Sequence, residues 1–323
     1  MKNILITGGA GFLGSHLIDK LVLQKNFNII CLDILDETKC IHLRNAKKFK
    51  NFTYIKCDIN NNKSLNKKIP KKIHSIFHFS SIVGVSDYIE KPDLLIKSII
   101  EASGNILNIS VKKKAKLYYA STSEVYGKNP KIPWSEEDDR VLGHTGIDRW
   151  SYSSGKALVE HLIHAYHKKY NLNFTIFRFF NIYGPRQREN FIISKNIYNL
   201  IYKKPLEVYD GGKMTRCFTY IDDAISCVLV AFKKSNSDLK TFNIGNKKEV
   251  KINDVINFAI KSYDKKAKIK KINTKLRYGQ KYQDIQRRVP NVRYAEKILK
   301  WKACTTYQEG IIKTINWYLE NKK

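Results

Sequence analysis

The sequence predicts an α/β fold in which a doubly wound parallel sheet carries a smaller C-terminal lobe. The first half of the 323-residue chain alternates short, continuously apolar runs with longer amphipathic segments. Apolar runs without polar alternation are typical of parallel strands that helices cover on both faces. With 43% hydrophobic residues, 16 glycines and 7 prolines, the composition excludes a disordered, fibrous or collagen-like chain.

In chain order, the first half follows a rhythm of strand and helix. Each expected strand is a short β-rich run, and each expected helix is a longer segment with apolar residues on one face. The expected strands are residues 4–7, 28–33, 53–57, 75–79, 116–121 and 173–179. The expected helices lie near residues 12–24, 92–113 and 153–170. This alternation is the reason for predicting a doubly wound sheet.

Beyond residue 185 the rhythm loosens into a mixed region. Helices are expected near residues 190–203, 222–233, 252–263 and 306–320, and short strands near 206–209 and 241–244. The lysine-rich stretch 264–275 is expected to be a loop or an edge rather than a domain boundary. We therefore expect residues 1–184 to form the sheet domain, with parts of 216–246 returning to it, and residues 185–323 to form mainly a substrate-binding lobe.

The chain is strongly basic, with a formal net charge of +30, and lysine supplies 48 of its 59 basic residues. Such a chain can bind nucleic acid, a membrane surface or an anionic small substrate. The lysines are spread along the whole sequence in pairs and triplets, whereas tracking a phosphate backbone needs a clustered stripe. We therefore expect a solvated surface and no nucleic-acid partner.

No segment has about 18 uninterrupted apolar residues, so the sequence predicts neither a membrane span nor a membrane partner. The first residues lack the apolar core and cleavage site of a secretory signal, which predicts a soluble, cytoplasmic protein. The six cysteines show no C-x-x-C spacing, so neither a zinc site nor a disulfide framework is expected. No residue is assigned to a metal.

The first expected strand runs into three glycines, Gly8-x-x-Gly11-x-x-Gly14, and then into an amphipathic helix. Gly8 permits a tight turn, Gly11 lets the backbone approach a pyrophosphate, and Gly14 allows the helix to pack closely on the strand. A glycine triplet alone also fits a merely tight turn. The flanking strand and helix favour a Rossmann-type dinucleotide site, with the phosphates at the helix N-terminus.

Two acidic residues at strand ends complete the expected cofactor site. Asp33 ends the second expected strand, where a carboxylate accepts hydrogen bonds from both ribose hydroxyls and repels a 2′-phosphate, so NAD is favoured over NADP. Asp58 and Ile59 follow the third expected strand, in position to lie beside the adenine. Asp58 fits equally well as a solvated strand-end aspartate.

A second group of residues predicts proton transfer. Tyr152 and Lys156 are four residues apart and so lie on one face of a helix, and Thr122 follows the fifth expected strand. The pKa of a phenol, about 10, must fall to about 7 for it to act as a base near neutrality, and two nearby cations supply that stabilisation. Tyrosine and lysine at this spacing also occur as an ordinary helix pair. The dinucleotide motif upstream favours the catalytic interpretation.

Taken together, these segments resemble the extended short-chain dehydrogenase/reductase family, and within it the nucleotide-sugar epimerases and dehydratases. The resemblance runs from about residue 3 to residue 320 and rests on TGGAGFLGSH, HFSSIVGV, ASTSEVYG, YSSGK and RFFNIYGPRQ. It implies a tightly held NAD, a nucleoside-diphosphate-sugar substrate and transient oxidation of the sugar at C4. It also implies a homodimer that pairs through helices 92–113 and 153–170.

The same resemblance implies roles for individual residues. Thr122, or its neighbour Ser123, would contact the C4 hydroxyl, Tyr152 would be the base, and Lys156 would hold both the nicotinamide ribose and the tyrosine. The other residues that it places in the site are Phe12, Leu13 and Ser80 for the cofactor, and Asn181 and Arg216 for the diphosphate and nucleotide.

Within the family, the chain most resembles UDP-glucuronate decarboxylases. The likeness rests on the spacing of TSE and VYG, on the arginine in DRWSY, and on YDGGKMTRCFT and YGQKYQDIQRRVP. It implies that Glu124, Arg149, Asp284 and Arg288 surround the reacting sugar. Once C4 is a ketone, the substrate is a β-keto acid, and loss of carbon dioxide leaves an enolate that needs a proton. Arg288 would then orient the carboxylate or protonate through water, and Glu124 would hold or relay a proton. Arg288 also fits a surface cation.

Two departures keep other activities open. Arg188 resembles an arginine of UDP-glucuronate 4-epimerases that clamps the carboxylate and discourages its loss, although pairing with Glu189 or solvent explains it equally well. Ile99 stands where the family usually has an asparagine, and Ala102-Ser103 replace the usual glycine-threonine pair. A 4,6-dehydratase fits less well because Ser123 replaces its acidic residue.

A different class of function is a non-catalytic Rossmann protein that senses NAD or binds RNA. The intact set of Thr122, Tyr152 and Lys156 argues against it, because a sensor has no need of proton transfer. The sequence therefore predicts an NAD-dependent UDP-glucuronate decarboxylase that yields a UDP-pentose or its 4-keto form. A UDP-sugar 4-epimerase is the alternative.

Overall fold

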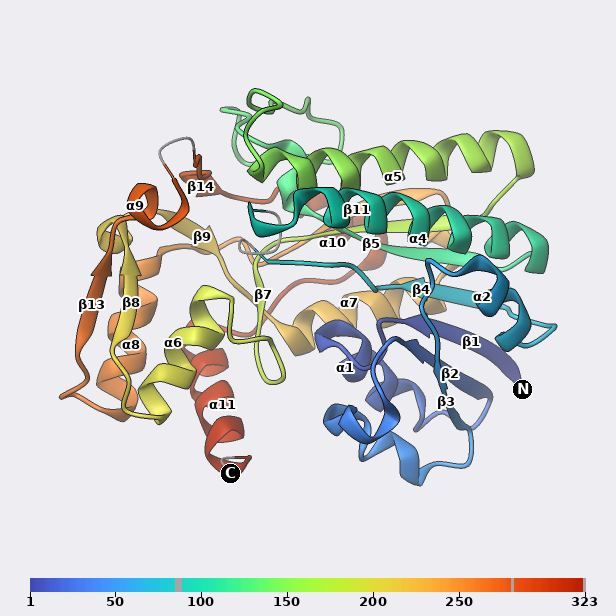
Figure 1. Cartoon of the computed structure of the whole chain (residues 1–323), viewed down its shortest axis with the longest axis horizontal. Coiled ribbons are helices and arrows are strands. Elements are labelled where there is room, and N and C mark those ends of the chain that lie inside the picture. Colours follow the sequence, from blue (N-terminus) through green and yellow to red (C-terminus); the bar gives the residue numbers. More distant parts are fainter. Residues whose placement is uncertain (85–88, 280–281, 322–323) are drawn as a thin grey trace.

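The structure, a computed structural model, describes residues 1–84, 89–279 and 282–321. Its centre is a seven-stranded sheet in the order β11-β6-β5-β4-β1-β2-β3 (Figure 1). Every neighbouring pair in this sheet is parallel. The strands are β1 (Lys2–Thr7), β2 (Phe27–Asp33), β3 (Phe52–Lys56), β4 (Ser75–His78), β5 (Lys116–Thr122), β6 (Phe174–Phe179) and β11 (Lys240–Ile244). The predicted doubly wound α/β sheet is confirmed.

Helices cover both faces of this sheet, which explains why its strands are continuously apolar. The covering helices are α1 (Phe12–Leu21), α2 (Asn62–Lys68), α4 (Pro92–Lys113), α5 (Arg149–Tyr170) and α7 (Ile221–Lys233). Within β1, Ile4 and Ile6 pack in a core with α1 and α7, whereas Leu5 packs in a second core with α2, α4 and α5. All three side chains are fully buried. Burial of one such side chain stabilises the fold by about 1.5–3 kcal/mol.

Of the helices in the described ranges, α4 alone has the length and apolar composition to cross a membrane. Its most apolar window is 44% buried, and the helix packs along α5 and against β4 and β5. A core helix of this kind passes the same test as a membrane span, so the finding is weak evidence for one. α4 and α5 both end on a residue in the left-handed conformation, Lys114 and Asn171, which stops each helix before the next strand.

The second half of the chain builds a smaller lobe on the left of Figure 1. Its helices are α6 (Ile192–Ile201), α8 (Ile252–Tyr263), α9 (Thr274–Tyr278) and α11 (Tyr307–Glu320), while α10 (Arg293–Leu299) packs against β11. One small sheet has the order β12-β9-β14, with strands Glu249–Lys251, Thr215–Cys217 and Arg287–Arg288. Another pairs β13 (Ile269–Ile272) with β8 (Leu206–Tyr209), and β7 (Ile182–Tyr183) pairs with β10 (Thr219–Tyr220).

Several short 3-10 helices connect these elements. The one that matters for the site is η4 (Ser123–Tyr126), directly after β5. The others are Glu37–Lys39, Ile41–Leu43, Ala46–Lys48, Asp210–Gly212 and Ser235–Ser237.

Most expected elements are present, with shifted ends. α5 begins at Arg149, four residues before the predicted start, because Arg149 and Trp150 are buried in its first turn. The stretch 264–275 was expected to be a loop or an edge, and it contains β13, an edge strand that pairs with β8. Several short or polar elements were not predicted from the sequence: α2, α9, α10, β7, β9, β10, β12 and β14. Within the segments that carried the resemblance, Val85, Gln280 and Lys281 lie outside the described residues.

Candidate active site

The glycine turn between β1 and α1 has the shape that a dinucleotide needs. Gly8 has a φ of +67°, and a Cβ atom at this position would lie 2.7 Å from the Cα atom of Ser80. A Cβ atom on Gly14 would lie 2.3 Å from the carbonyl oxygen of Gly8, so only glycine lets α1 approach the strand. Gly11 precedes the helix and makes no side-chain cap, which leaves the first backbone N–H groups of α1 available to phosphate oxygens.

The side chains around this turn also fit NAD. The Asp33 carboxylate, at the end of β2, accepts a hydrogen bond of 3.0 Å from the backbone N–H of Ala10, which holds it beside the glycine turn. The Ser80 hydroxyl lies 2.9 Å from that of Thr7, at the ends of β4 and β1. Phe12 and Leu13, the first residues of α1, are partly buried. These residues lie together around the glycine turn, and their contacts with NAD stay a prediction.

Asp58 is exposed, and its carboxylate accepts hydrogen bonds of 2.9 Å from the backbone and side-chain N–H groups of Asn60. This is the local bonding of a strand-end aspartate. Ile59 is buried, and the Asn105 side chain donates to its carbonyl oxygen over 2.9 Å. Asn105 on α4 thus fixes the loop that is expected beside the adenine.

Replacing Asp33 with alanine is expected to weaken NAD binding by about tenfold or more and to reduce the preference for NAD over NADP. The carboxylate is expected to supply both the ribose contact and the repulsion of a 2′-phosphate. Calorimetric titration of the stripped protein with each dinucleotide measures both effects. Unchanged affinities would remove Asp33 from the cofactor site.

The expected proton-transfer residues come together where β5 meets α5. The Thr122 hydroxyl accepts a hydrogen bond of 3.2 Å from the backbone N–H of Glu124, which shapes the turn into η4. Lys156 is buried and donates from Nζ to the carbonyl oxygen of Ala120 over 2.9 Å. Burial lowers the pKa of Lys156 to about 7, against the opposing effect of the Glu160 carboxylate. The lysine is therefore placed at the carboxyl end of β5.

The surroundings of Tyr152 act on its pKa in opposite directions. Burial raises this pKa well above its ordinary value, the negative charge of Glu124 raises it further, and a hydrogen bond with Thr122 opposes the rise only in part. Burial is the largest of these effects. The predicted fall requires two cations near the phenol, the Lys156 ammonium and the nicotinamide ring of bound NAD, so it stays a prediction for the complex with NAD. The nearness of Glu124 cannot be read from the spacing of tyrosine and lysine.

Three arginines and two carboxylates form the arginine cluster, defined as Glu124, Arg149, Arg216, Asp284 and Arg288. Glu124 Oε1 lies 3.0 Å from a guanidinium nitrogen of Arg288 and 3.5 Å from one of Arg149. Asp284 Oδ1 lies 3.2 Å from Arg149, 3.3 Å from Arg216 and 3.6 Å from Arg288. These residues come from η4, α5, β9, β14 and the segment before β14, so only the fold brings them together.

The charges of the arginine cluster stabilise one another. Burial raises the pKa of Asp284, but the three guanidinium groups outweigh burial and hold this pKa at about 2. Burial likewise opposes ionisation of Glu124, and Arg149 and Arg288 bring its pKa below the ordinary value. Burial and the charge of Arg288 lower the pKa of Arg216 to about 10. Three cations face two anions, so the cluster has a net positive charge that suits an anionic substrate.

Two polar atoms of the arginine cluster can still form a hydrogen bond with a ligand. Oε2 of Glu124 and Nε of Arg288 are buried and have no hydrogen-bond partner among the described residues. Buried polar atoms without partners are uncommon in folded proteins and often mark a ligand site. Both atoms lie beside the turn that carries Thr122, which connects the arginine cluster with the proton-transfer residues.

The remaining predicted substrate residues fall into different places. Ser123 is buried in η4, and the Asn181 side chain donates to the carbonyl oxygen of Cys217 over 3.4 Å, next to Arg216. Arg188 is exposed and makes neither an ion pair nor a side-chain hydrogen bond within the described ranges. It therefore lies outside the arginine cluster. Of the two alternatives expected for Arg188, a pair with Glu189 is not seen among the described residues, whereas exposure to solvent is.

Tyr282 is a site residue that was not predicted from the sequence. Its hydroxyl accepts a hydrogen bond of 2.9 Å from Arg149 and lies 3.5 Å from Asp284. The signal was present in the segment YGQKYQDIQRRVP, where an aromatic residue stands two positions before the aspartate. At the departures noted in α4, Ile99 packs against Gly155, and the Ser103 hydroxyl lies 3.1 Å from Nε2 of the buried His78.

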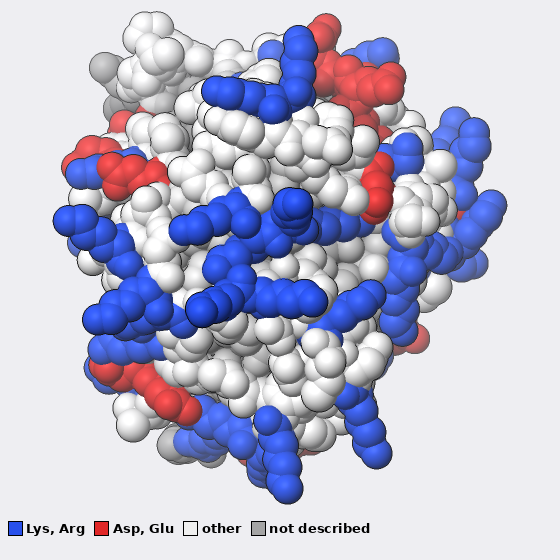
Figure 2. Space-filling model, turned by 90° about the vertical axis from the view of Figure 1, so that its right-hand side faces the viewer, with Lys and Arg blue, Asp and Glu red and all other residues white. Residues whose placement is uncertain are grey.

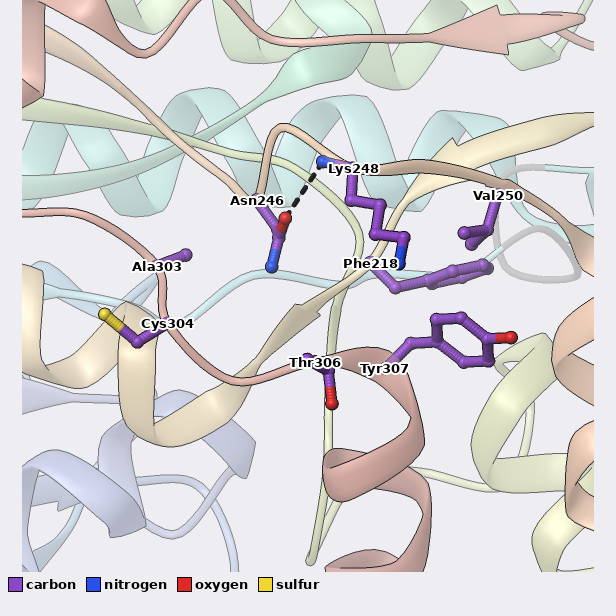
Figure 3. A pocket seen from close by; sticks show the side chains of 8 residues that line it. All are labelled: Phe218, Asn246, Lys248, Val250, Ala303, Cys304, Thr306 and Tyr307. Carbon is purple, nitrogen blue, oxygen red and sulfur yellow. Dashed lines mark hydrogen bonds between the residues drawn. The ribbon is translucent and has the colours of Figure 1, made fainter.

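A cavity of about 180 Å³ lies elsewhere in the molecule. Its lining residues are Phe218, Asn246, Lys248, Val250, Ala303, Cys304, Thr306 and Tyr307 (Figure 3). None of these residues belongs to the arginine cluster or to the proton-transfer set. Among the described residues, no group of three histidine, cysteine or acidic side chains is arranged to hold a metal ion.

Comparison with known proteins decides the family. Residues 4–245 match the profile of the NAD dependent epimerase/dehydratase family. The chain belongs to this family. A curated relative, the UDP-N-acetyl-alpha-D-glucosaminuronate decarboxylase of Bacillus cytotoxicus, is 34% identical over 323 residues, which cover 99% of this chain and 98% of the relative.

Two further relatives agree with this assignment to the epimerase/dehydratase family. The bifunctional polymyxin resistance protein ArnA of Wigglesworthia glossinidia brevipalpis is 34% identical over 342 residues, which cover 99% of this chain and 52% of ArnA. The crystal structure of UDP-glucuronic acid 4-epimerase from Bacillus cereus, with UDP-glucuronic acid and NAD, aligns over 99% of both chains with a TM-score of 0.87 and 26% identity. The 323-residue chain is therefore an NAD-dependent nucleotide-sugar enzyme of the epimerase/dehydratase family.

Proposed function

We propose that this enzyme oxidises a UDP-linked hexuronate at C4 and then removes its carboxyl group as carbon dioxide. The observation that carries the proposal is the contact of Arg288 with Glu124, 3.0 Å long, directly beside Thr122. Through this contact, a cation that can bind a carboxylate lies next to the proton-transfer residues. When bound, NAD supplies the acceptor for the hydride of C4 and returns it. The arginine cluster would hold the anionic parts of the substrate.

The proposed chemistry assigns one task to each group. Tyr152, bonded to Thr122, takes the proton of the C4 hydroxyl as C4 becomes a ketone. Arg288 orients the carboxylate so that the C5–C6 bond can break, and the electron pair passes to the C4 oxygen as an enolate. Glu124 relays the proton that C5 then receives. A UDP-pentose forms if the hydride returns to C4, and a UDP-4-ketopentose is released if it does not.

The position of Arg188 supports decarboxylation over epimerisation. An epimerase has to retain the carboxylate, and the arginine that resembles its clamp is exposed here and lies outside the arginine cluster. The names of the curated relatives from Bacillus cytotoxicus and Wigglesworthia are consistent with a decarboxylase or a multifunctional enzyme, whereas the structural neighbour from Bacillus cereus is an epimerase. Epimerisation therefore remains the alternative to be tested.

Replacing Arg188 with alanine is expected to leave the ratio of carbon-losing to carbon-retaining product unchanged, because its side chain is exposed and lies outside the arginine cluster. Product ratios from mass spectrometry of the wild type and the variant test this. A shift toward loss of carbon in the variant would mean that Arg188 reaches the carboxylate, which would favour the epimerase.

The substrate test uses purified enzyme with two UDP-hexuronates. UDP-glucuronate is the substrate that the sequence predicts, and its 2-acetamido counterpart is suggested by the name of the Bacillus cytotoxicus relative. Mass spectrometry and proton NMR follow the sugar in each reaction. Loss of carbon dioxide from either one supports the proposal. A product of unchanged mass with inverted C4 identifies an epimerase, and no reaction with either uronate contradicts both.

We also propose that the enzyme is a homodimer that pairs through α4 and α5. Leu94 and Ile96 on α4 and Leu158 on α5 are 52%, 37% and 44% exposed, an apolar surface that a second copy would cover. Replacing Leu158 with glutamate is expected to lower the sedimentation coefficient from that of a dimer to that of a monomer. A wild-type monomer in the ultracentrifuge would contradict the proposal.

A further inference from the structure

Lysines that are spread along the sequence gather on one face of the folded enzyme. Figure 2 shows this face, the right-hand side of Figure 1, with basic side chains across it and acidic ones mainly at its margin. In a parallel sheet with crossover helices, every helix-to-strand connection arrives at the amino ends of the strands. Here these connections are residues 22–28, 49–53, 69–76, 112–117, 168–174 and 233–240, and they contain one acidic residue, Asp238, and no arginine.

We define the lysine face as the exposed lysines of these connections and their helix ends. They are Lys2, Lys25, Lys50, Lys71, Lys72, Lys112, Lys114, Lys168, Lys169 and Lys233. Within the described ranges none of these ammonium groups forms an ion pair, because Asp238 is already paired with Lys116. The lysine face is therefore a surface of uncompensated positive charge.

Hydrogen bonds join the separate connections into one continuous surface. The backbone N–H of Lys2 donates to Asn26 over 3.0 Å. Lys113 Nζ donates to the carbonyl oxygen of Lys71 over 3.1 Å, which brings the end of α4 beside the connection into β4. At the far edge, the backbone N–H of Leu239 donates to Phe174 over 2.7 Å.

Apolar side chains protrude from the same surface. Met1, Leu23, Tyr170 and Leu239 are 67%, 63%, 47% and 46% exposed, and each lies in or beside one of these connections. Leu239 also has a φ of +59°, a conformation that a bulky residue rarely adopts. The Tyr170 ring packs against that of Tyr166, with centroids 5.3 Å apart, and still leaves nearly half of its surface to solvent.

We propose that the lysine face binds an anionic lipid bilayer. Lysine ammonium groups near such a surface are attracted by headgroups of any identity, and the protruding apolar side chains enter the interface between headgroups and acyl chains. Because the arginine cluster lies at the opposite, carboxyl ends of the strands, the active site faces away from the bilayer. This proposal does not depend on which reaction the enzyme catalyses.

Neither helix dipoles nor a nucleic-acid partner accounts for the whole lysine face. Lysines in the last turn of a helix are stabilised by its dipole, but Lys2, Lys50, Lys71 and Lys72 lie outside helices. Nucleic-acid sites combine positive charge with arginine contacts and stacked aromatic rings. The connections hold no arginine, and Tyr170 is the one exposed aromatic side chain at this edge in the described part of the chain.

The test is co-sedimentation with vesicles of phosphatidylcholine, with and without about one-third phosphatidylserine. The wild type is expected to bind only the anionic vesicles, and less as salt rises. Changing Lys71, Lys72, Lys112 and Lys168 to glutamate is expected to lower this binding by about 600-fold, since each of the four lysines contributes roughly fivefold. The matched control changes Lys265, Lys266, Lys270 and Lys271 to glutamate, which alters the net charge equally but away from the lysine face.

Equal loss of binding in both variants would show that net charge alone acts and would overturn the proposal. So would absence of wild-type binding, or retention of a single-stranded RNA probe at moderate salt by a protein that ignores vesicles. NAD content and the thermal midpoint verify that each variant is folded. A second variant, Leu23→Asn with Leu239→Asn, keeps every charge and suits the positive φ of Leu239. It is expected to lose the binding that remains at high salt.

Discussion

Replacing Tyr152 with phenylalanine is expected to lower turnover of the UDP-hexuronate by about a thousandfold or more while NAD stays bound. The hydroxyl is the group bonded to Thr122 at the carboxyl end of β5, and proton transfer by one positioned group contributes about 10²–10⁴ to a rate. The ring itself remains, so packing beside the cofactor is preserved. Single-turnover formation of NADH and steady-state release of carbon dioxide measure the effect.

The matched control is Tyr166→Phe. Tyr166 lies on the same helix, α5, and its hydroxyl donates to the Asn108 side chain over 2.7 Å, away from the arginine cluster. This variant is expected to keep wild-type turnover. Undiminished activity of Tyr152→Phe would remove the tyrosine from the mechanism, whereas equal loss in both variants would indicate a general effect on α5.

The parts of the fold that the sequence predicts are those whose local pattern follows from burial. β1, β2 and β6 are covered on both faces, so their apolar runs are continuous and stand out from the surroundings. α2 was missed because its sequence, NKSLNKK, buries only Leu65 and shows no apolar face. The strands β9, β12 and β14 have two or three residues, too few for a period to be visible.

Some residues of the candidate site can likewise be predicted from local sequence pattern, and others cannot. The glycine turn and Asp33 are adjacent to predicted elements, so local pattern is enough to place them. Glu124 and Asp284 are 160 positions apart, and nothing in either neighbourhood indicates that both contact Arg149 and Arg288; only resemblance suggested it. The raised pKa of Tyr152 depends on burial beside Glu124. The lysine face depends on the topology of the sheet, which turns dispersed residues into a patch.

Replacing Arg288 with lysine is expected to lower carbon dioxide release by about a hundredfold although the positive charge is kept. The two terminal nitrogens of Arg288 face different carboxylates, Glu124 at 3.0 Å and Asp284 at 3.6 Å. A lysine ammonium is a single point charge on a flexible stem and cannot make both contacts while it holds a substrate carboxylate. Leaving a buried partner unpaired costs about 2–5 kcal/mol.

Whether Arg288 acts on the substrate carboxylate is decided by which step slows in Arg288→Lys, oxidation at C4 or release of carbon dioxide. Oxidation at C4, followed as NADH formation in a single turnover, is expected to change much less than release of carbon dioxide, so the variant should accumulate NADH. Arg287→Lys is the matched control, because Arg287 is the adjacent residue of β14 but is exposed and pairs with Glu249 at 2.7 Å. If both steps slow equally in Arg288→Lys while Arg287→Lys is unaffected, Arg288 binds the substrate as a whole and does not direct decarboxylation.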